Sequence, residues 1–115
     1  MYQLSYDEIL ADAGGEARSR EYTALDRVVG LLRRAENRER RAPETIEALD
    51  ILQRLWSFLI KDLSDPDNAL AEPLKTDLIS IGIWNISEAD RLLAEPDRSL
   101  SAIIEINENI RDGLK

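Results

Sequence analysis

The stretch that decides the fold is residues 44–63, which read ETIEALDILQRLWSFLIKDL. On a helical wheel at about 100° per residue, its apolar side chains cover roughly 240° of the circumference. The narrow polar strip that remains holds Asp50 and Arg54, an i, i+4 pair in the favourable order with the acid first. Because a helix this apolar has to be covered on two sides, the stretch predicts a helix packed between neighbours.

Three further stretches carry apolar residues at i, i+3, i+4 spacing, which is typical of amphipathic helices. The predicted helices are residues 16–41, 44–63, 73–95 and 99–112. The segments that separate them contain proline, at Pro43, Asp65–Asn68 and Pro96. No stretch shows strand-like alternation, so the sequence predicts an all-α fold, a small bundle of about four main helices in one domain over residues 1–115. The pattern leaves the packing order of the helices open.

The region ahead of residue 16 contains a break at Gly14-Gly15. Before it, Ser5 and Glu8 fit a capping box, which indicates a short leading helix over residues 5–13. At the other end of the chain, Gly113 is placed as a C′ residue that ends the last helix.

The chain has 115 residues and contains neither cysteine nor histidine. It therefore lacks thiolate chemistry, the commonest general base and the commonest metal ligand. Paired carboxylates such as Asp65/Asp67 lie at predicted helix ends or polar faces, where solvated surface is the simpler interpretation. The composition favours a binding or structural protein over an enzyme, and we expect no catalytic residue, no cofactor and no metal site.

The formal net charge is −8, and the whole excess lies in residues 42–115, because residues 1–41 are balanced. An acidic chain repels phosphate backbones, which disfavours direct nucleic-acid binding. The exception is the basic stretch 33–41, with five arginines and two glutamates. It has no interleaved aromatic residues, so a solvated helix end is favoured over an RNA contact. Neither a targeting segment nor an apolar span of about 20 residues is visible, which predicts a cytoplasmic protein without a membrane partner.

Four side chains have two interpretations each. Trp56 lies in the broad apolar arc of residues 44–63 and is either core or interface. Trp84 lies on the polar half of its predicted helix and is either covered by another segment or left for a partner. Asn85 and Asn107 interrupt apolar faces, and a buried amide without partners costs about 1–3 kcal/mol. Each amide therefore needs hydrogen bonds from its neighbours, from water or from a bound backbone at the edge of a groove.

A set of short motifs occurs in order along almost the whole chain. They are Met1–Tyr6 (MYQLSY), Glu47–Leu49 (EAL), Arg54–Trp56 (RLW), Asn68–Leu70 (NAL), Leu78–Trp84 (LISIGIW), Ile106-Asn107 and Ile110–Leu114 (IRDGL). With these motifs the sequence resembles the FlaF family of flagellar biosynthesis proteins from alphaproteobacteria. The resemblance implies a non-enzymatic role in flagellin production, in which the protein binds flagellin as an export chaperone. It also implies work alongside FlbT-like proteins, which regulate flagellin messenger RNA.

The first hypothesis is therefore a chaperone that covers an amphipathic flagellin segment in an apolar groove between helices. The predicted contact residues are Arg54, Trp56, Leu59, Ile83, Trp84, Asn107 and Ile110. Arg54 is expected to pair with an acidic group of the client. The alternative is a regulatory adaptor that acts with an FlbT-like protein on flagellin messenger RNA, directly through residues 33–41 or indirectly. A homodimer would also bury spare apolar surface, and the sequence leaves the oligomeric state open.

Overall fold

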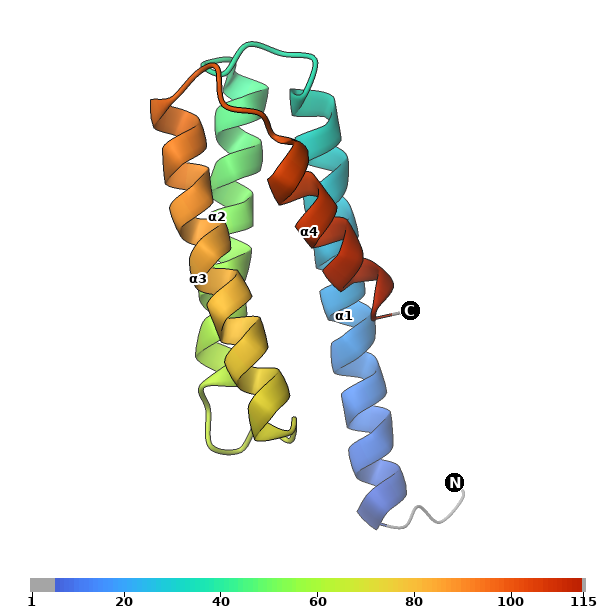
Figure 1. Cartoon of the computed structure of the whole chain (residues 1–115). Helices are drawn as coiled ribbons and strands as arrows, with labels where there is room; N and C mark the ends of the chain where they lie inside the picture. The colour runs from blue at the N-terminus through green and yellow to red at the C-terminus, as the bar shows by residue number, and fades with distance from the viewer. Residues whose placement is uncertain (1–5, 115) are drawn as a thin grey trace.

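Four helices make up the part of the chain that the computed structural model describes, residues 6–114, with side chains from residue 18 onward (Figure 1). They are α1 (Tyr6–Ala35), α2 (Pro43–Leu63), α3 (Glu72–Ala94) and α4 (Ser101–Asp112). No strand occurs within residues 6–114. The all-α class predicted from the apolar spacing is therefore confirmed.

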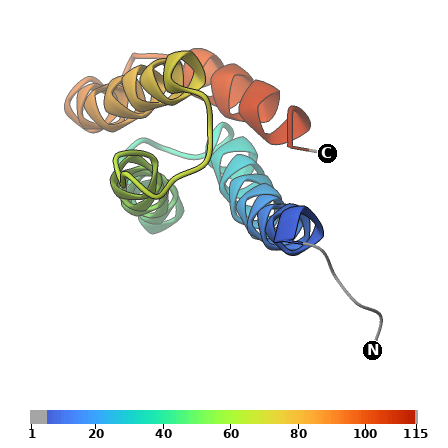
Figure 2. The ribbon, with the colours of Figure 1, turned by 90° about the horizontal axis from the view of Figure 1, so that it is seen from below.

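The helices alternate in direction and form two layers. Seen along the bundle, α1 and α2 lie side by side, α3 lies over α2, and α4 lies over α1 (Figure 2). Helix α2 therefore packs against both α1 and α3, as its broad apolar arc requires. Helices α3 and α4 contact each other least of the neighbouring pairs.

Helix α1 differs from its prediction at the N-terminal side. It runs without interruption through Gly14 and Gly15, so the residues of the predicted leading helix from Tyr6 on belong to α1. A glycine costs about 1 kcal/mol in a helix interior relative to alanine, but it keeps its backbone hydrogen bond, unlike proline. Helix-forming neighbours on both sides outweigh that cost. Ser5, part of the predicted capping box, lies outside the described residues.

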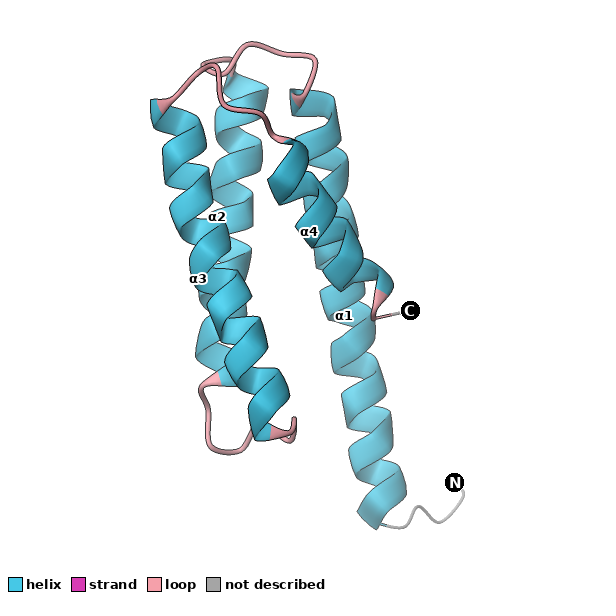
Figure 3. Ribbon diagram, viewed as in Figure 1, coloured by secondary structure: helices cyan, strands magenta, loops and turns pink. Residues whose placement is uncertain are grey.

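Helix α1 also ends at Ala35 and not at residue 41, in the loop drawn pink between α1 and α2 (Figure 3). Pro43 begins α2 and disfavours helical backbone at the residue before it. Ala42 accordingly has extended angles, φ −61° and ψ 143°. The residues between Ala35 and Ala42 form successive turns that reverse the chain, with Arg38 N donating to Ala35 O at 3.0 Å.

The basic stretch is partly used inside the fold. The Arg40 guanidinium donates hydrogen bonds to the carbonyl oxygens of Leu92 at 2.6 Å and Glu95 at 3.1 Å, and to that of Arg98. These are carbonyls at the end of α3 and in the α3–α4 loop, where a helix leaves acceptors without intrahelical partners. Arg40 therefore fastens the α1–α2 loop to the α3–α4 loop.

The last residues of α2 and α4 match their predictions, and the other remaining helix ends differ from theirs by one or two residues. Ser99, predicted to begin the last helix, precedes α4, and its Oγ accepts a hydrogen bond of 3.0 Å from the Ser101 backbone N–H. Gly113 follows the last residue of α4 and caps the helix, as predicted, with a right-handed φ of −69°.

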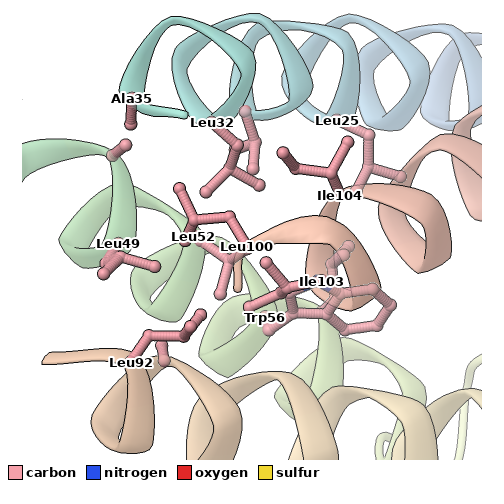
Figure 4. Packing of buried hydrophobic residues seen from close by; sticks show 14 residues of the cluster. Leu25, Leu32, Ala35, Leu49, Leu52, Trp56, Leu92, Leu100, Ile103 and Ile104 are labelled. Carbon is pink, nitrogen blue, oxygen red and sulfur yellow. The ribbon is translucent and has the colours of Figure 1, made fainter. Parts of the chain in front are cut away.

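The core runs between all four helices, with Trp56 of α2 in it at 1% exposure (Figure 4). Large apolar side chains from each helix meet there. The labelled members are Leu25, Leu32, Ala35, Leu49, Leu52, Trp56, Leu92, Leu100, Ile103 and Ile104. All of these positions belong to the apolar faces predicted from the sequence.

Gly82 sets the distance between α2 and α3. A Cβ at this position would lie 2.8 Å from Trp56 Cε3 and 2.9 Å from Ile60 Cγ1. Both distances are shorter than van der Waals contact, so no larger residue fits without a shift of α2 or α3. The glycine lets the Trp56 ring pack directly against the α3 backbone.

Candidate partner-binding site

Three buried polar side chains form a continuous hydrogen-bond chain across α2, α4 and α3. Trp56 Nε1 donates to Asn107 Oδ1 at 2.9 Å, and Asn107 Nδ2 donates to Asn85 Oδ1 at 2.7 Å. Asn107 Nδ2 also donates to Ile103 O at 2.7 Å, and Asn85 Nδ2 donates to Ile81 O at 2.9 Å. The two asparagines are fully buried.

This chain fixes the register of α4. A buried polar group without a partner costs about 1–3 kcal/mol. Sliding α4 by one residue would leave Trp56 Nε1, Asn107 Oδ1 and Asn85 Oδ1 without partners. No buried side-chain nitrogen or oxygen among the described side chains lacks a partner. The expectation that both asparagines need hydrogen bonds is met from within the chain, without a bound backbone.

The Asn85–Asn107 bond also places the apolar residues on either side of it. Because α3 and α4 are antiparallel, Ile81, one turn before Asn85, and Ile110, one turn after Asn107, lie on the same side of the pair. Trp84 directly precedes Asn85, and Ile106 directly precedes Asn107. Both side chains lie nearer the surface, where α3 and α4 meet. Ile81, Trp84, Ile106 and Ile110 are only partly buried.

The junction continues past the end of α4. Helix α4 has 12 residues and α3 has 23, so α4 covers only part of the length of α3 (Figure 1). On α3, Leu74 and Leu78 continue the stripe of Ile81 toward the uncovered end, and Leu74 is exposed. We call this surface the α3–α4 seam. It consists of Leu74, Leu78, Ile81, Trp84, Ile106, Ile110 and Leu114.

Ion pairs hold α4 on the opposite side of the seam, against α1. Arg111 Nη1 lies 3.1 Å from Asp26 Oδ1, and the Arg33 guanidinium donates to Glu108. The apolar side of α4 thus faces α3, while its charged side faces α1. Since Arg33 and Arg40 both serve the fold, two of the five arginines of the basic stretch are committed to contacts within the chain.

Glu88 lies buried where α3 approaches the α3–α4 loop. Its carboxylate accepts two hydrogen bonds from Arg98, at 2.8 Å from Nε and 2.9 Å from Nη2. These bonds hold the pKa of Glu88 below its ordinary value of 4.5, in spite of its burial. The pair fixes the loop that leads into α4.

The structure corrects three of the predicted contact residues. Trp56, Leu59 and Asn107 lie in the interior, with Trp56 and Asn107 bonded to each other. Each occurs on a helix face that a second helix covers, which a single-helix wheel does not reveal. All three side chains are closed off by other parts of the chain in this structure, so a partner does not reach them.

Two predicted contact residues lie in the seam and two lie elsewhere. Trp84 and Ile110 are partly buried seam residues. Ile83 is 55% exposed and follows Ile81 by two positions, so it projects from the outer face of α3. Arg54 is exposed on α2, paired with Asp50 at 3.1 Å, away from the seam.

Several positions that shape the seam or the loops beside it were not singled out from the sequence. The α4 side of the seam was identified at Ile110 but not at Ile106, although both occur in the isoleucine run of α4. Gly82 carries a signal of its own, because a glycine inside an apolar helix face indicates close approach of another backbone or ring. Arg40 and Glu88 carry none, because their partners lie far away in the sequence.

These features define a class, a small all-helical protein with a buried polar chain that positions an unpartnered apolar surface. No group of side chains suited to a metal ion occurs among the described residues. The chain belongs to the FlaF family, because the family model described as flagellar protein FlaF matches residues 2–114. The family expected from the sequence motifs is thereby confirmed, and the protein is a flagellar protein.

The other comparisons add no relatives. Neither the search among curated proteins nor that among solved structures returned a match. Within residues 6–114, no helix combines the length and the apolar character that crossing a membrane requires.

Proposed function

We propose that this FlaF-family protein is a flagellin-binding export chaperone that covers an amphipathic flagellin helix in the α3–α4 seam. Flagellin's terminal segments form amphipathic helices that would self-associate if left bare. An apolar helix face is best covered by a groove that offers anchors at i, i+3, i+4 and i+7. The proposal combines the family membership with this surface.

The observation that carries the proposal is the row of apolar side chains left partly open along α3 and α4. Leu74, Ile81 and Trp84 come from α3, and Ile106 and Ile110 come from α4. The polar groups beneath the row are bonded to one another, so a client needs to supply only apolar contacts there. An aromatic anchor such as Trp84 is the residue type that most often dominates binding energy.

The proposed role is non-enzymatic and cytoplasmic and needs no cofactor. The chain has neither histidine nor cysteine, which leaves it without the usual general base and nucleophile. Binding of a client before export requires only a shaped surface. An FlbT-like regulator would be a second partner in this proposal.

The test is calorimetric titration of purified flagellin into the protein and three variants. Trp84→Ala and Ile110→Ser change the seam, and Ile83→Ser makes the same isoleucine substitution outside it. We expect Kd to rise by about tenfold or more for the two seam variants and to stay unchanged for Ile83→Ser.

Circular dichroism of each variant separates loss of binding from loss of fold. Absence of a complex at micromolar concentration would remove the chaperone proposal. Equal weakening by Ile83→Ser and Ile110→Ser would remove the seam as the site, while leaving the chaperone role standing.

A further inference from the structure

A second groove lies between α1 and α2, on the side of the molecule that faces away from α3 and α4. It is lined by Ala24, Arg27, Val28, Ile51, Arg54 and Leu55. On α1, Asp26 and Arg33 face α4. Arg27 lies about 100° round the helix from Asp26 and so on a different face.

On α2, Gln53 faces α3, where it donates to Ile86 O and to Asp90. Arg54 lies about 100° round α2 from Gln53 and so also on a different face. The groove therefore lies apart from the α3–α4 seam, with the core residue Val28 among its lining.

The floor and one wall of this groove are apolar. Ile51 and Leu55 are partly buried, and Phe58, seven residues after Ile51 and three after Leu55, lies on the same side of α2. Phe58 is 65% exposed, the largest exposed fraction among the large apolar side chains described. A phenylalanine left this open beside an apolar groove marks a surface where a partner can bury it.

The other wall of the groove carries a row of cations. Arg20, Arg27 and Arg34 recur every seven residues on α1, so they share one face of the helix with a drift of about 20° per step. All three are exposed. No ion pair engages any of them among the described side chains. Arg54 on the far wall is paired with Asp50, so the three α1 arginines supply the positive charge of this side, although the chain as a whole carries −8.

We propose that the α1–α2 groove docks an acidic amphipathic α-helix of a partner protein, separately from the seam. The apolar face of that helix would cover Leu55 and Phe58. Carboxylates spaced seven residues apart along it would meet Arg20, Arg27 and Arg34, since both helices have the same repeat. Arginine suits this role because its guanidinium binds a carboxylate through two parallel hydrogen bonds. The exposed phenylalanine and the apolar floor favour a protein helix over an RNA strand.

The test uses amide NMR of the full-length protein titrated with a designed helical peptide that has leucines on one face and glutamates seven residues apart beside it. A matched peptide carries lysines in place of the glutamates. We expect shifts at Ala24, Arg27, Leu55 and Phe58 with the glutamate peptide only. The double variant R27E/R34E should weaken that peptide by about tenfold and gain binding of the lysine peptide. Arg38→Glu, in the α1–α2 loop, serves as the control and should change neither.

Several outcomes overturn the proposal. They are shifts confined to the seam, equal binding of both peptides, and an R27E/R34E variant that binds like the wild type. Binding of a single-stranded RNA but not of the glutamate peptide assigns the arginines to nucleic acid. A self-association constant that falls with R27E/R34E assigns the groove to a second copy of the chain. None of these results bears on flagellin binding at Trp84 and Ile110, so the two proposals fail independently.

Discussion

Asn107 makes more buried polar contacts than any other side chain in the seam region. It accepts from Trp56 and donates to Asn85 and to the Ile103 carbonyl. An asparagine is suited to this position because its side chain offers both an acceptor and two donors. The amide thus joins three helices at one point.

Replacement of Asn107 by leucine keeps most of the volume and removes all of these bonds. Trp56 Nε1 and Asn85 Oδ1 are then buried without partners, and we expect a loss of about 2–4 kcal/mol in the free energy of unfolding. Urea unfolding followed by tryptophan fluorescence measures it. Asn109→Leu, at an exposed position of the same helix, is the control and should stay within about 0.5 kcal/mol. Equal stabilities for the two variants would contradict the structural role of the polar chain.

Two glycines in helix interiors give a matched pair. Gly82→Ala drives a methyl group into Trp56 and Ile60, and we expect it to destabilise the fold by about 1–3 kcal/mol. Gly30→Ala meets no atom within 4 Å and gains helix propensity, so we expect about 0.5–1 kcal/mol of added stability. Thermal unfolding compares them. A stabilising Gly82→Ala would show that α2 and α3 are not held at the distance described.

Two buried or half-buried carboxylates at the helix interfaces have pKa shifts of opposite sign. Hydrogen bonds from Arg98 lower the pKa of Glu88. Burial, and next the negative charge of Asp62, raise the pKa of Glu21 between α1 and α2. A lowered pKa contributes stability above the unfolded value of 4.5 that is lost as the pH falls through the folded value. A raised pKa contributes stability only at low pH, and that contribution is lost as the pH rises.

The substitutions Glu88→Gln and Glu21→Gln are therefore expected to change the free energy of unfolding in opposite directions near neutral pH. Glu88→Gln should lower the free energy of unfolding by about 1–2 kcal/mol, because Arg98 loses a charged partner. Glu21→Gln should raise it, because a carboxylate no longer faces Asp62. Both differences from the wild type should shrink as the pH falls toward about 3. Urea titrations over this range measure them, and a constant difference for either variant would contradict the assigned sign.

The sequence predicted the helices well and their surroundings less well. Apolar spacing identified all four helices and the core faces, including Trp56 and Leu52. It could not separate Trp56 from the surface, because a helical wheel gives the direction of a side chain and not what covers that direction. The continuous α1 was missed since Gly14 and Gly15 weaken a helix without stopping it. The turn after Ala35 depends on the reversal into α2, which no local pattern shows.

At the scale of the whole molecule, the α3–α4 layer and the α1–α2 layer each carry an apolar surface, and the two surfaces differ in their polar surroundings. The α3–α4 seam is apolar over a satisfied polar chain, whereas the α1–α2 groove is apolar and flanked by a row of exposed arginines on α1. Of the seven predicted contact residues, Trp84 and Ile110 lie in the seam and Arg54 lines the α1–α2 groove. Taken together, the two proposals give each of two partners a separate surface of the same chain.

The central claim is that flagellin covers the seam while the core stays closed, and the two tryptophans report on each. With fluorotryptophan incorporated only into this protein, fluorine NMR gives one resonance for buried Trp56 and one for half-buried Trp84. We predict that adding flagellin shifts the Trp84 resonance and removes its sensitivity to solvent, while the Trp56 resonance stays in place. A shift of Trp56 with Trp84 unchanged, or no shift of either in a formed complex, would contradict the account.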